Sequence, residues 1–130
     1  MFKPLTSKNM AQDLKLRTKK FAIDCWRLCK CFPTSREYNA YVNKLIRCSS
    51  SVGANYRATQ RAKSTADFIN KLKIVEEEAD ESNFFLELLF EIYDLKNESV
   101  PSEIERLIKE SNELVAIVVS SINTAKSKLN

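Results

Sequence analysis

The chain has 130 residues, of which 44% are hydrophobic and 29% are charged, and its formal net charge is +4. That length favours one domain, spanning residues 1–130, and the single glycine and three prolines exclude a sheet with many hairpin turns. The sequence contains no histidine, which excludes the catalytic triads and proton shuttles that depend on this side chain.

The predicted elements are four amphipathic helices, and the first two lie in the N-terminal half. The first covers about residues 11–32, where apolar side chains recur at intervals of three, four and seven residues, and Pro33 ends it. The second follows Thr34, the expected N-cap, because Glu37 completes a capping box, and it reaches about Arg61. The inward positions of these two helices are Leu14, Phe21, Ala22, Cys25, Leu28, Cys29, Phe32, Tyr38, Tyr41, Val42, Leu45, Ile46, Cys48 or Ser49, and Val52.

The third and fourth helices fill the C-terminal half. Ser64 is the expected N-cap of the third, with Asp67 three residues later, and this helix ends near Asp94. Pro101 begins the fourth, and Ser102–Glu105 is a further capping box. Their inward positions are Phe68, Leu72, Val75, Ala79, Ser82, Leu86, Leu89, Ile104, Leu107, Ile108, Leu114, Val115, Val118, Ile122, Ala125 and Leu129. Four such helices joined by short loops predict an all-α, antiparallel up-down-up-down four-helix bundle.

Some apolar side chains fall outside these inward stripes. Phe84 and Leu88 on the third helix and Ile117 on the fourth are out of phase with the core positions. Because large apolar patches are rarely exposed on monomers, these three residues predict a subunit interface. The alternative is a wide core stripe that bends over the end of the bundle.

The sequence predicts no metal site, no cofactor and no membrane segment. A zinc site usually needs C-x2-C pairs, and we expect the four cysteines to be small buried hydrophobes in a reducing cytoplasm: Cys25, Cys29, Cys31 and Cys48. No apolar run approaches the roughly 18 residues of a membrane span, and the first residues lack the apolar core of a signal peptide. We therefore expect a cytoplasmic protein.

Charge is divided unevenly along the chain. Residues 1–73 contain 16 Lys and Arg against four Asp and Glu, whereas residues 74–130 contain five Lys and Arg against 13 Asp and Glu. This asymmetry predicts either a basic surface for a polyanion or basic helices that pack against acidic ones.

The segment RCSSSVGANYRATQRA, Arg47–Ala62, places the only glycine inside a predicted helix. A glycine there costs about 1 kcal/mol relative to alanine, so a compensating interaction is expected. Close helix packing would supply it, with Ser49 and Gly53 at the contact and Asn55 bridging two helices. The alternative is an anion site, where the small face admits a phosphate and three arginines supply charge: Arg47, Arg57 and Arg61.

The longer segment Arg47–Leu89 resembles the four-helix-bundle family of proteins encoded in intervening sequences of bacterial 23S rRNA genes. The family pattern has an Arg-Ser pair, Ser-Ile/Val, small residues and Asn, then Asp/Glu-Phe and an acidic E-x-x-E segment. These elements match Arg47, Ser51-Val52, Asn55, Asp67-Phe68 and Glu78–Glu81. KKFAIDCWRLCKCFP is similar to the family's first helix, so the resemblance covers about residues 14–125.

The resemblance implies a homopentameric ring without catalytic activity. A related protein, the accessory variability determinant of diversity-generating retroelements, binds nucleic acid and a reverse transcriptase through a basic surface. The chain departs from the family at Ala58-Thr59, where relatives commonly carry glutamate, so the role of that glutamate is not carried over.

Two functions remain open, and neither is enzymatic. The first is an oligomeric accessory protein that binds the backbone of RNA or DNA through Lys15, Arg17, Lys19, Lys20, Arg57, Arg61 and Lys63. For the first four of these, a solvated helix face is the alternative. The second function is a structural or protein-docking scaffold, in which basic residues pair with acidic ones such as Glu76–Glu81. A carboxylate-bridged metal enzyme is disfavoured because its Glu-x-x-His motifs need histidine.

Overall fold

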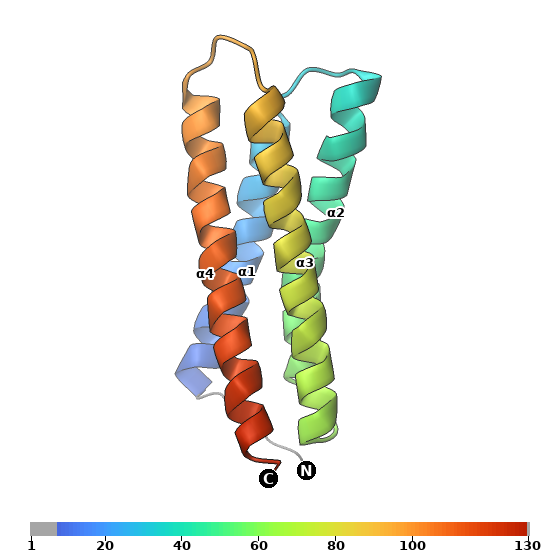
Figure 1. Ribbon diagram of the computed structural model, residues 1–130, viewed down its shortest axis with the longest axis vertical. Coiled ribbons are helices and arrows are strands. Elements are labelled where there is room, and N and C mark those ends of the chain that lie inside the picture. Colours follow the sequence, from blue (N-terminus) through green and yellow to red (C-terminus); the bar gives the residue numbers. More distant parts are fainter. Residues whose placement is uncertain (1–7, 130) are drawn as a thin grey trace.

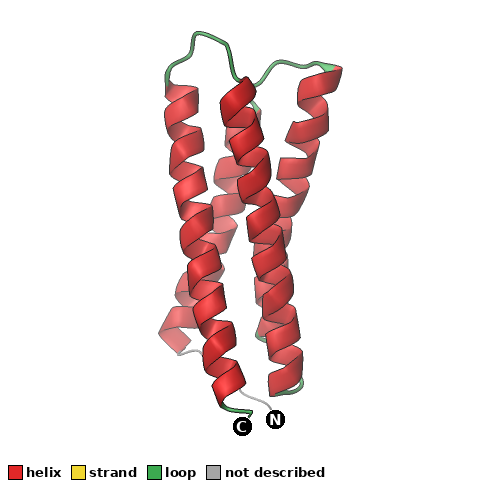
Figure 2. Cartoon of the chain, in the orientation of Figure 1, coloured by secondary structure: helices red, strands yellow, loops and turns green. Residues whose placement is uncertain are grey.

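The computed structural model describes residues 8–129, and of Lys8 the backbone alone. It contains four helices: α1 (Lys8–Cys29), α2 (Arg36–Thr59), α3 (Thr65–Ile92) and α4 (Ser99–Ser127). No strand occurs among the described residues (Figure 2). The predicted all-α fold of four helices is therefore confirmed.

The four helices lie side by side along one long axis (Figure 1). The α1–α2 and α3–α4 connections lie at one end, and the α2–α3 connection lies at the other. α1 packs against α2 and α4, and α3 packs against the same two helices. None of the helices in residues 8–129 is long and apolar enough to cross a membrane.

The core follows the predicted inward stripes closely. All seven inward positions predicted on α3 are buried, and Leu45 and Val52 on α2 are fully covered. Five buried polar residues were missed because hydropathy does not mark them: Thr18, Asp24, Thr59, Asn83 and Ser111. Among them, the Thr18 hydroxyl donates to Leu14 O at 2.8 Å, and Ser111 accepts from Asn83 Nδ2 at 2.8 Å. Leu129 was wrongly placed inward, since it is exposed near the end of the chain.

Of the three N-caps predicted from the sequence, one is correct. Ser64 caps α3 as predicted, and its hydroxyl accepts a hydrogen bond from Asp67 N at 3.1 Å. The cap of α2 is Ser35, not Thr34, because Ser35 has the extended backbone and accepts from Tyr38 N at 3.1 Å. Both residues are competent caps, so composition alone does not distinguish them.

The capping box predicted at Ser102–Glu105 is wrong. α4 begins at Ser99, three residues earlier, so the box residues lie inside the helix. The N-cap residue of α4 is Glu98, and its side chain forms no capping hydrogen bond. Asn97 Oδ1 accepts from Ser99 N at 3.1 Å instead. Pro101 is accommodated because the first helical turn has no internal partner for its N–H groups.

Candidate nucleic-acid interface

Four predicted basic residues come together where α1 and α2 lie next to each other. Lys15 and Lys19 of α1, Arg57 of α2 and Arg61 in the turn just after α2 line two adjoining hollows, of about 230 and 280 Å³. Both hollows are lined by Lys15 and Arg57, so they form one continuous feature. All four side chains are exposed. We call this set of four residues the basic groove.

Small residues form the floor of the basic groove. Ala22, Ser50, Gly53 and Ala54 line the larger hollow between the basic side chains. A Cβ added at Gly53 would lie 3.4 Å from Thr18 Oγ1 and 3.5 Å from its carbonyl oxygen, which is ordinary van der Waals contact. α1 and α2 therefore approach closely here, and the small side chains both permit this packing and leave the groove open.

The other two residues predicted to mediate helix packing, Ser49 and Asn55, both form hydrogen bonds within α2. Ser49 is fully buried, and its hydroxyl donates to Ile46 O at 3.3 Å. Asn55 was expected to bridge two helices, but its Nδ2 donates to Ser51 O of the same helix at 2.8 Å. The bridging role is therefore replaced by a bond within α2.

Two predicted nucleic-acid contacts are engaged in ion pairs inside the chain. Arg17 Nη2 lies 2.6 Å from Glu110 Oε1 and 3.1 Å from Glu113 Oε2, both on α4. Its hydrogen bond to Glu110 raises the pKa of the guanidinium, despite the opposing effect of burial. Lys20 Nζ lies 2.6 Å from Asp24 Oδ2. These cations are already neutralised by neighbours, unlike those of the basic groove.

Lys63, the last of the predicted basic residues, lines neither hollow. It lies in the α2–α3 connection, where its backbone N donates to Asp67 Oδ2 at 2.9 Å. Its side chain is exposed. The structure therefore divides the seven predicted basic residues into a groove of four, two paired cations and one separate lysine.

Asp24 joins α1 to α4 through a second ion pair. Arg106 Nη2 lies 2.9 Å from Asp24 Oδ2, and the carboxylate is largely buried. Burial opposes ionisation, but hydrogen bonds from Lys20 and Arg106 outweigh it and lower the pKa of the Asp24 carboxyl. The ion pairs of Arg17 with α4 follow the charge asymmetry of the sequence, whereas the Asp24–Arg106 pair runs against it.

Three of the four cysteines are buried as expected: Cys25, Cys29 and Cys48. The expectation is wrong for Cys31, which is exposed near the end of α1. Burial raises the pKa of the Cys29 thiol to about 12 and also raises that of Cys25 and Cys48. In the part of the chain that the structure describes, no group of three Cys, Asp or Glu side chains is placed to hold a metal ion.

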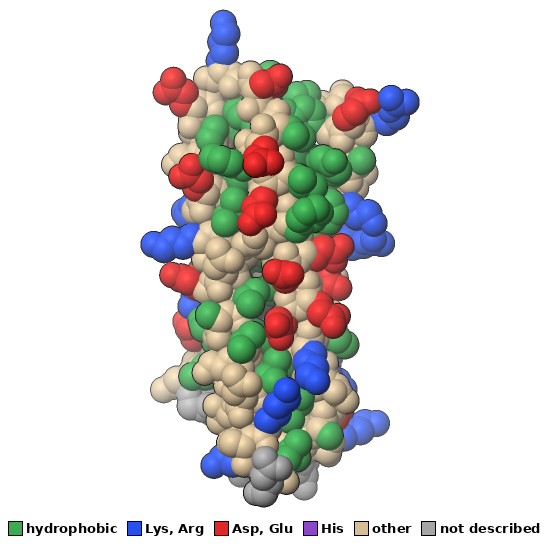
Figure 3. Space-filling view, viewed as in Figure 1, with side chains coloured by type: hydrophobic (Ala, Val, Ile, Leu, Met, Phe, Trp, Pro, Cys, Tyr) green, Lys and Arg blue, Asp and Glu red, His purple; other side chains and the backbone are tan. Residues whose placement is uncertain are grey.

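Exposed apolar side chains occur on α1 as well as on α3. Phe84, a predicted interface residue, is 54% exposed, whereas Leu88 and Ile117 are half-buried. Figure 3 shows hydrophobic side chains interspersed with acidic ones on the face formed by α3 and α4. Sequence reasoning missed a second stripe on α1, where Leu16, Ile23 and Trp26 are exposed. These residues are spaced by seven and three positions on the side of α1 opposite the core, and this spacing was the sequence signal for an exposed apolar stripe.

Comparison with known proteins places the chain in a family. Residues 12–120 match the family of 23S rRNA-intervening sequence proteins. A crystal structure of a protein of unknown function from the S23 ribosomal protein family of Bacteroides thetaiotaomicron VPI-5482 is similar, with a TM-score of 0.74 and 30% sequence identity. The similarity covers 87% of this chain and 97% of that one. No curated protein matches the chain. The chain therefore belongs to the 23S rRNA-intervening sequence protein family.

Proposed function

We propose that this chain is a non-enzymatic accessory protein of the cytoplasm that binds the backbone of RNA or DNA through the basic groove. One observation carries the proposal. The four cations of the groove converge on one surface, and none forms an ion pair with an acidic side chain in residues 9–129. Unpaired cations that share a hollow favour a polyanion as ligand.

The groove has the chemistry that phosphate recognition needs. Its floor of small side chains allows a phosphate to approach the helix surface, and two guanidinium groups at its edge offer bidentate hydrogen bonds. Tyr56, which also lines the groove, is only 1% exposed, so its ring offers no face on which a base could stack. We therefore expect contacts to phosphate with weak preference for sequence.

We also propose that the up-down-up-down bundles assemble into a ring, as the homopentamers of the family do. The exposed apolar stripes on α1 and α3 support this assembly. α1 and α3 each pack between α2 and α4, so their outer faces point away from each other. Contact between the α1 face of one copy and the α3 face of the next would close a ring. Such a ring would repeat the basic groove and strengthen binding through avidity.

A structural or protein-docking scaffold is the second candidate function. The observation in its favour is that Arg17 and Lys20 pair with acidic side chains of the same chain. If the groove cations instead meet acidic residues of a partner protein, such as a reverse transcriptase, the same surface would serve protein docking. Nucleic acid would then have no role.

Binding to a structured RNA and to duplex DNA, measured by fluorescence anisotropy over a range of salt concentrations, tests the proposal. We expect affinity to fall steeply with salt, with a logarithmic slope of about −0.7 to −0.9 for each phosphate contacted. Light scattering should give a mass near five times 15.0 kDa for the free assembly. An assembly that binds neither nucleic acid at low salt would contradict the first function and favour the scaffold.

A further inference from the structure

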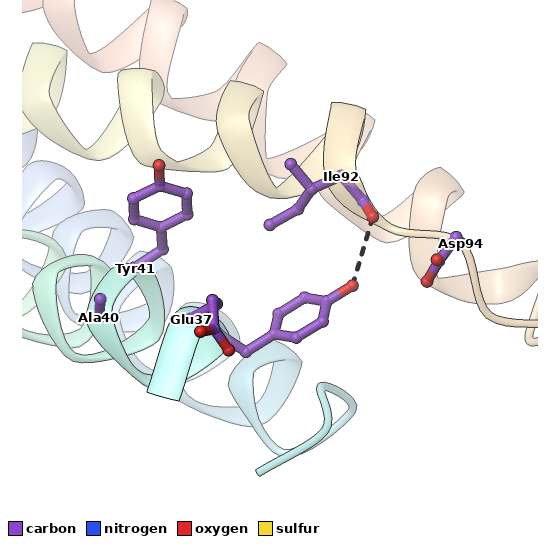
Figure 4. Close-up of a pocket in the computed structure, with 6 residues that line it drawn as sticks. Glu37, Ala40, Tyr41, Ile92 and Asp94 are labelled. Carbon is purple, nitrogen blue, oxygen red and sulfur yellow. Dashed lines mark hydrogen bonds between the residues drawn. The ribbon is translucent and has the colours of Figure 1, made fainter. Parts of the chain in front are cut away.

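A second cavity lies at the other end of the bundle from the basic groove, where α2 begins and α3 ends. Figure 4 shows its lining side chains, which come from segments far apart in the sequence. The cavity has a volume of about 470 Å³ and is lined by Glu37, Tyr38, Ala40, Tyr41, Ile92 and Asp94. We call it the end pocket.

The aromatic walls of the end pocket are held in place by the fold. The Tyr38 ring stacks on Phe32 with a centroid distance of 5.5 Å, and its hydroxyl donates to Ile92 O at 3.4 Å. The Tyr41 ring lies 6.0 Å from that of Phe85. Both rings therefore keep their positions without a ligand, and little ordering is needed when one binds.

The polar edge of the end pocket is acidic. Asp94 forms no ion pair with a described basic residue, and Glu37 pairs only with its exposed neighbour Arg36, at 2.9 Å. Tyr38 and Asp94 line the same pocket, and burial together with the negative charge of Asp94 raises the pKa of Tyr38. An anion would be repelled from this edge, and a cation would be attracted.

The C-terminal end of α3 adds to this negative potential. Its last turn contains no basic residue, although the unpaired carbonyl groups of a helix end favour a cation there. Glu91 and Asp94 increase the negative charge instead, and Lys96 in the following loop forms no ion pair with a described carboxylate. A positive group from outside the chain would satisfy this end of the helix.

We propose that the end pocket binds the guanidinium group of an arginine side chain on a protein partner. The aliphatic part of arginine fits against Ile92 and Ala40, its planar head stacks on a tyrosine ring, and its N–H groups donate to Asp94. Arginine is favoured over lysine because only the guanidinium group is planar, so it can stack on a ring and bind a carboxylate at the same time. The volume is sufficient for the side chain with its flanking backbone. This inference does not rest on nucleic-acid binding, which uses the other end of the molecule.

Titration with two capped tripeptides tests the proposal. One peptide has arginine between two glycines, and the other has citrulline, the uncharged analogue of arginine, at the same position. NMR of the aromatic side chains reports binding at Tyr38 and Tyr41. We expect the arginine peptide to shift both signals and the citrulline peptide to leave them unchanged. Asp94→Asn should weaken arginine binding about threefold, the effect of an exposed ion pair.

The matched control is Glu98→Gln, which removes an exposed carboxylate in the connection to α4 that lies outside the pocket. We expect it to leave arginine binding unchanged, and Glu37→Gln provides a second variant within the pocket. Equal binding of the two peptides, or equal weakening by Asp94→Asn and Glu98→Gln, would overturn the proposal. Tighter binding of spermidine than of the arginine peptide would also overturn it, because spermidine has no planar group. RNA affinity should be unaffected by Asp94→Asn, which separates this test from that of the basic groove.

Discussion

Glu37 and Arg57, near the two ends of α2, have opposite charge, and each borders a different surface. Glu37 lies in the first turn beside the end pocket, whereas Arg57 lies in the last turn beside the basic groove. Both placements agree with the helix macrodipole, which favours acidic side chains at the start and basic ones at the end by about 0.3–1 kcal/mol each. Helix stability alone therefore explains these two charges.

The same reasoning does not explain the charges that face them. Lys15 and Lys19 lie in the middle of α1, where the macrodipole gives them no advantage. Asp94 follows the last turn of α3, where a negative charge is unfavourable. In each region, one end of α2 supplies a charge that helix stability favours, and a neighbouring segment supplies a charge that helix stability does not need. We call Lys15, Lys19 and Asp94 surplus charges, and they, rather than the total charge, are the basis of both ligand proposals.

Removing the buried, paired carboxylate of Asp24 should affect stability more than removing an exposed carboxylate of the same helix. Asp24→Ala takes away the acceptor of Lys20 and Arg106 and should lower the free energy of unfolding by about 2 kcal/mol. Asp13→Ala, at an exposed position on the same helix, is the matched control and should change it by less than about 0.5 kcal/mol. Urea denaturation measures both values, and equal losses would contradict the role assigned to the Asp24 pairs.

The paired and surplus charges should also differ in their response to pH. Because its ion pairs lower the pKa of Asp24 in the folded state, this residue stabilises the fold at pH values above its unfolded pKa. That contribution is lost as the pH falls through the lowered pKa. Asp24→Asn should therefore be less stable than the native chain near neutral pH, with a difference that shrinks in acid. A difference that stays constant to low pH would contradict this account.

The smallest effect is expected at the floor of the basic groove. Gly53→Ala should raise the free energy of unfolding by about 0.5–1 kcal/mol, because alanine favours the helix and the added methyl group meets Thr18 at ordinary contact distance. Thermal denaturation checks the sign of the change. The substitution should also weaken RNA binding slightly, because the methyl group occupies part of the floor. A destabilised variant would show that α1 and α2 pack more tightly than the Thr18 contact indicates.

Much of the fold could be predicted because it depends on local patterns. The spacing of apolar residues identified the four helices and their buried sides. Gly53 lies next to Thr18 of α1, where an added Cβ would make ordinary van der Waals contact. Helix starts were less certain, because neighbours such as Thr34 and Ser35 have nearly the same capping chemistry. The difference between them lies in backbone geometry, which composition does not reveal.

The candidate sites could be predicted only in part, because they depend on partners distant in the sequence. Arg17 and Lys19 are two residues apart on α1, yet one pairs with Glu110 on α4 and the other lines the groove with α2. Which side of α1 meets which helix is a property of the assembled bundle. The end pocket was missed for the same reason, since Tyr38 and Ile92 belong to different helices. The absence of a basic residue in the last turn of α3 was the only sequence signal.

The most direct test of the central claim compares two double variants that remove the same charge. Arg57→Ala with Arg61→Ala removes two of the four cations of the basic groove, whereas Arg27→Ala with Arg36→Ala removes two exposed arginines that do not line it. Anisotropy titrations with one structured RNA at low salt, over several salt concentrations, give the affinity and its slope for each variant. We predict that the groove variant alone loses about tenfold or more in affinity, with a slope shallower by about 1 to 2. Equal losses in the two variants would show that overall charge, and not the groove, binds the nucleic acid.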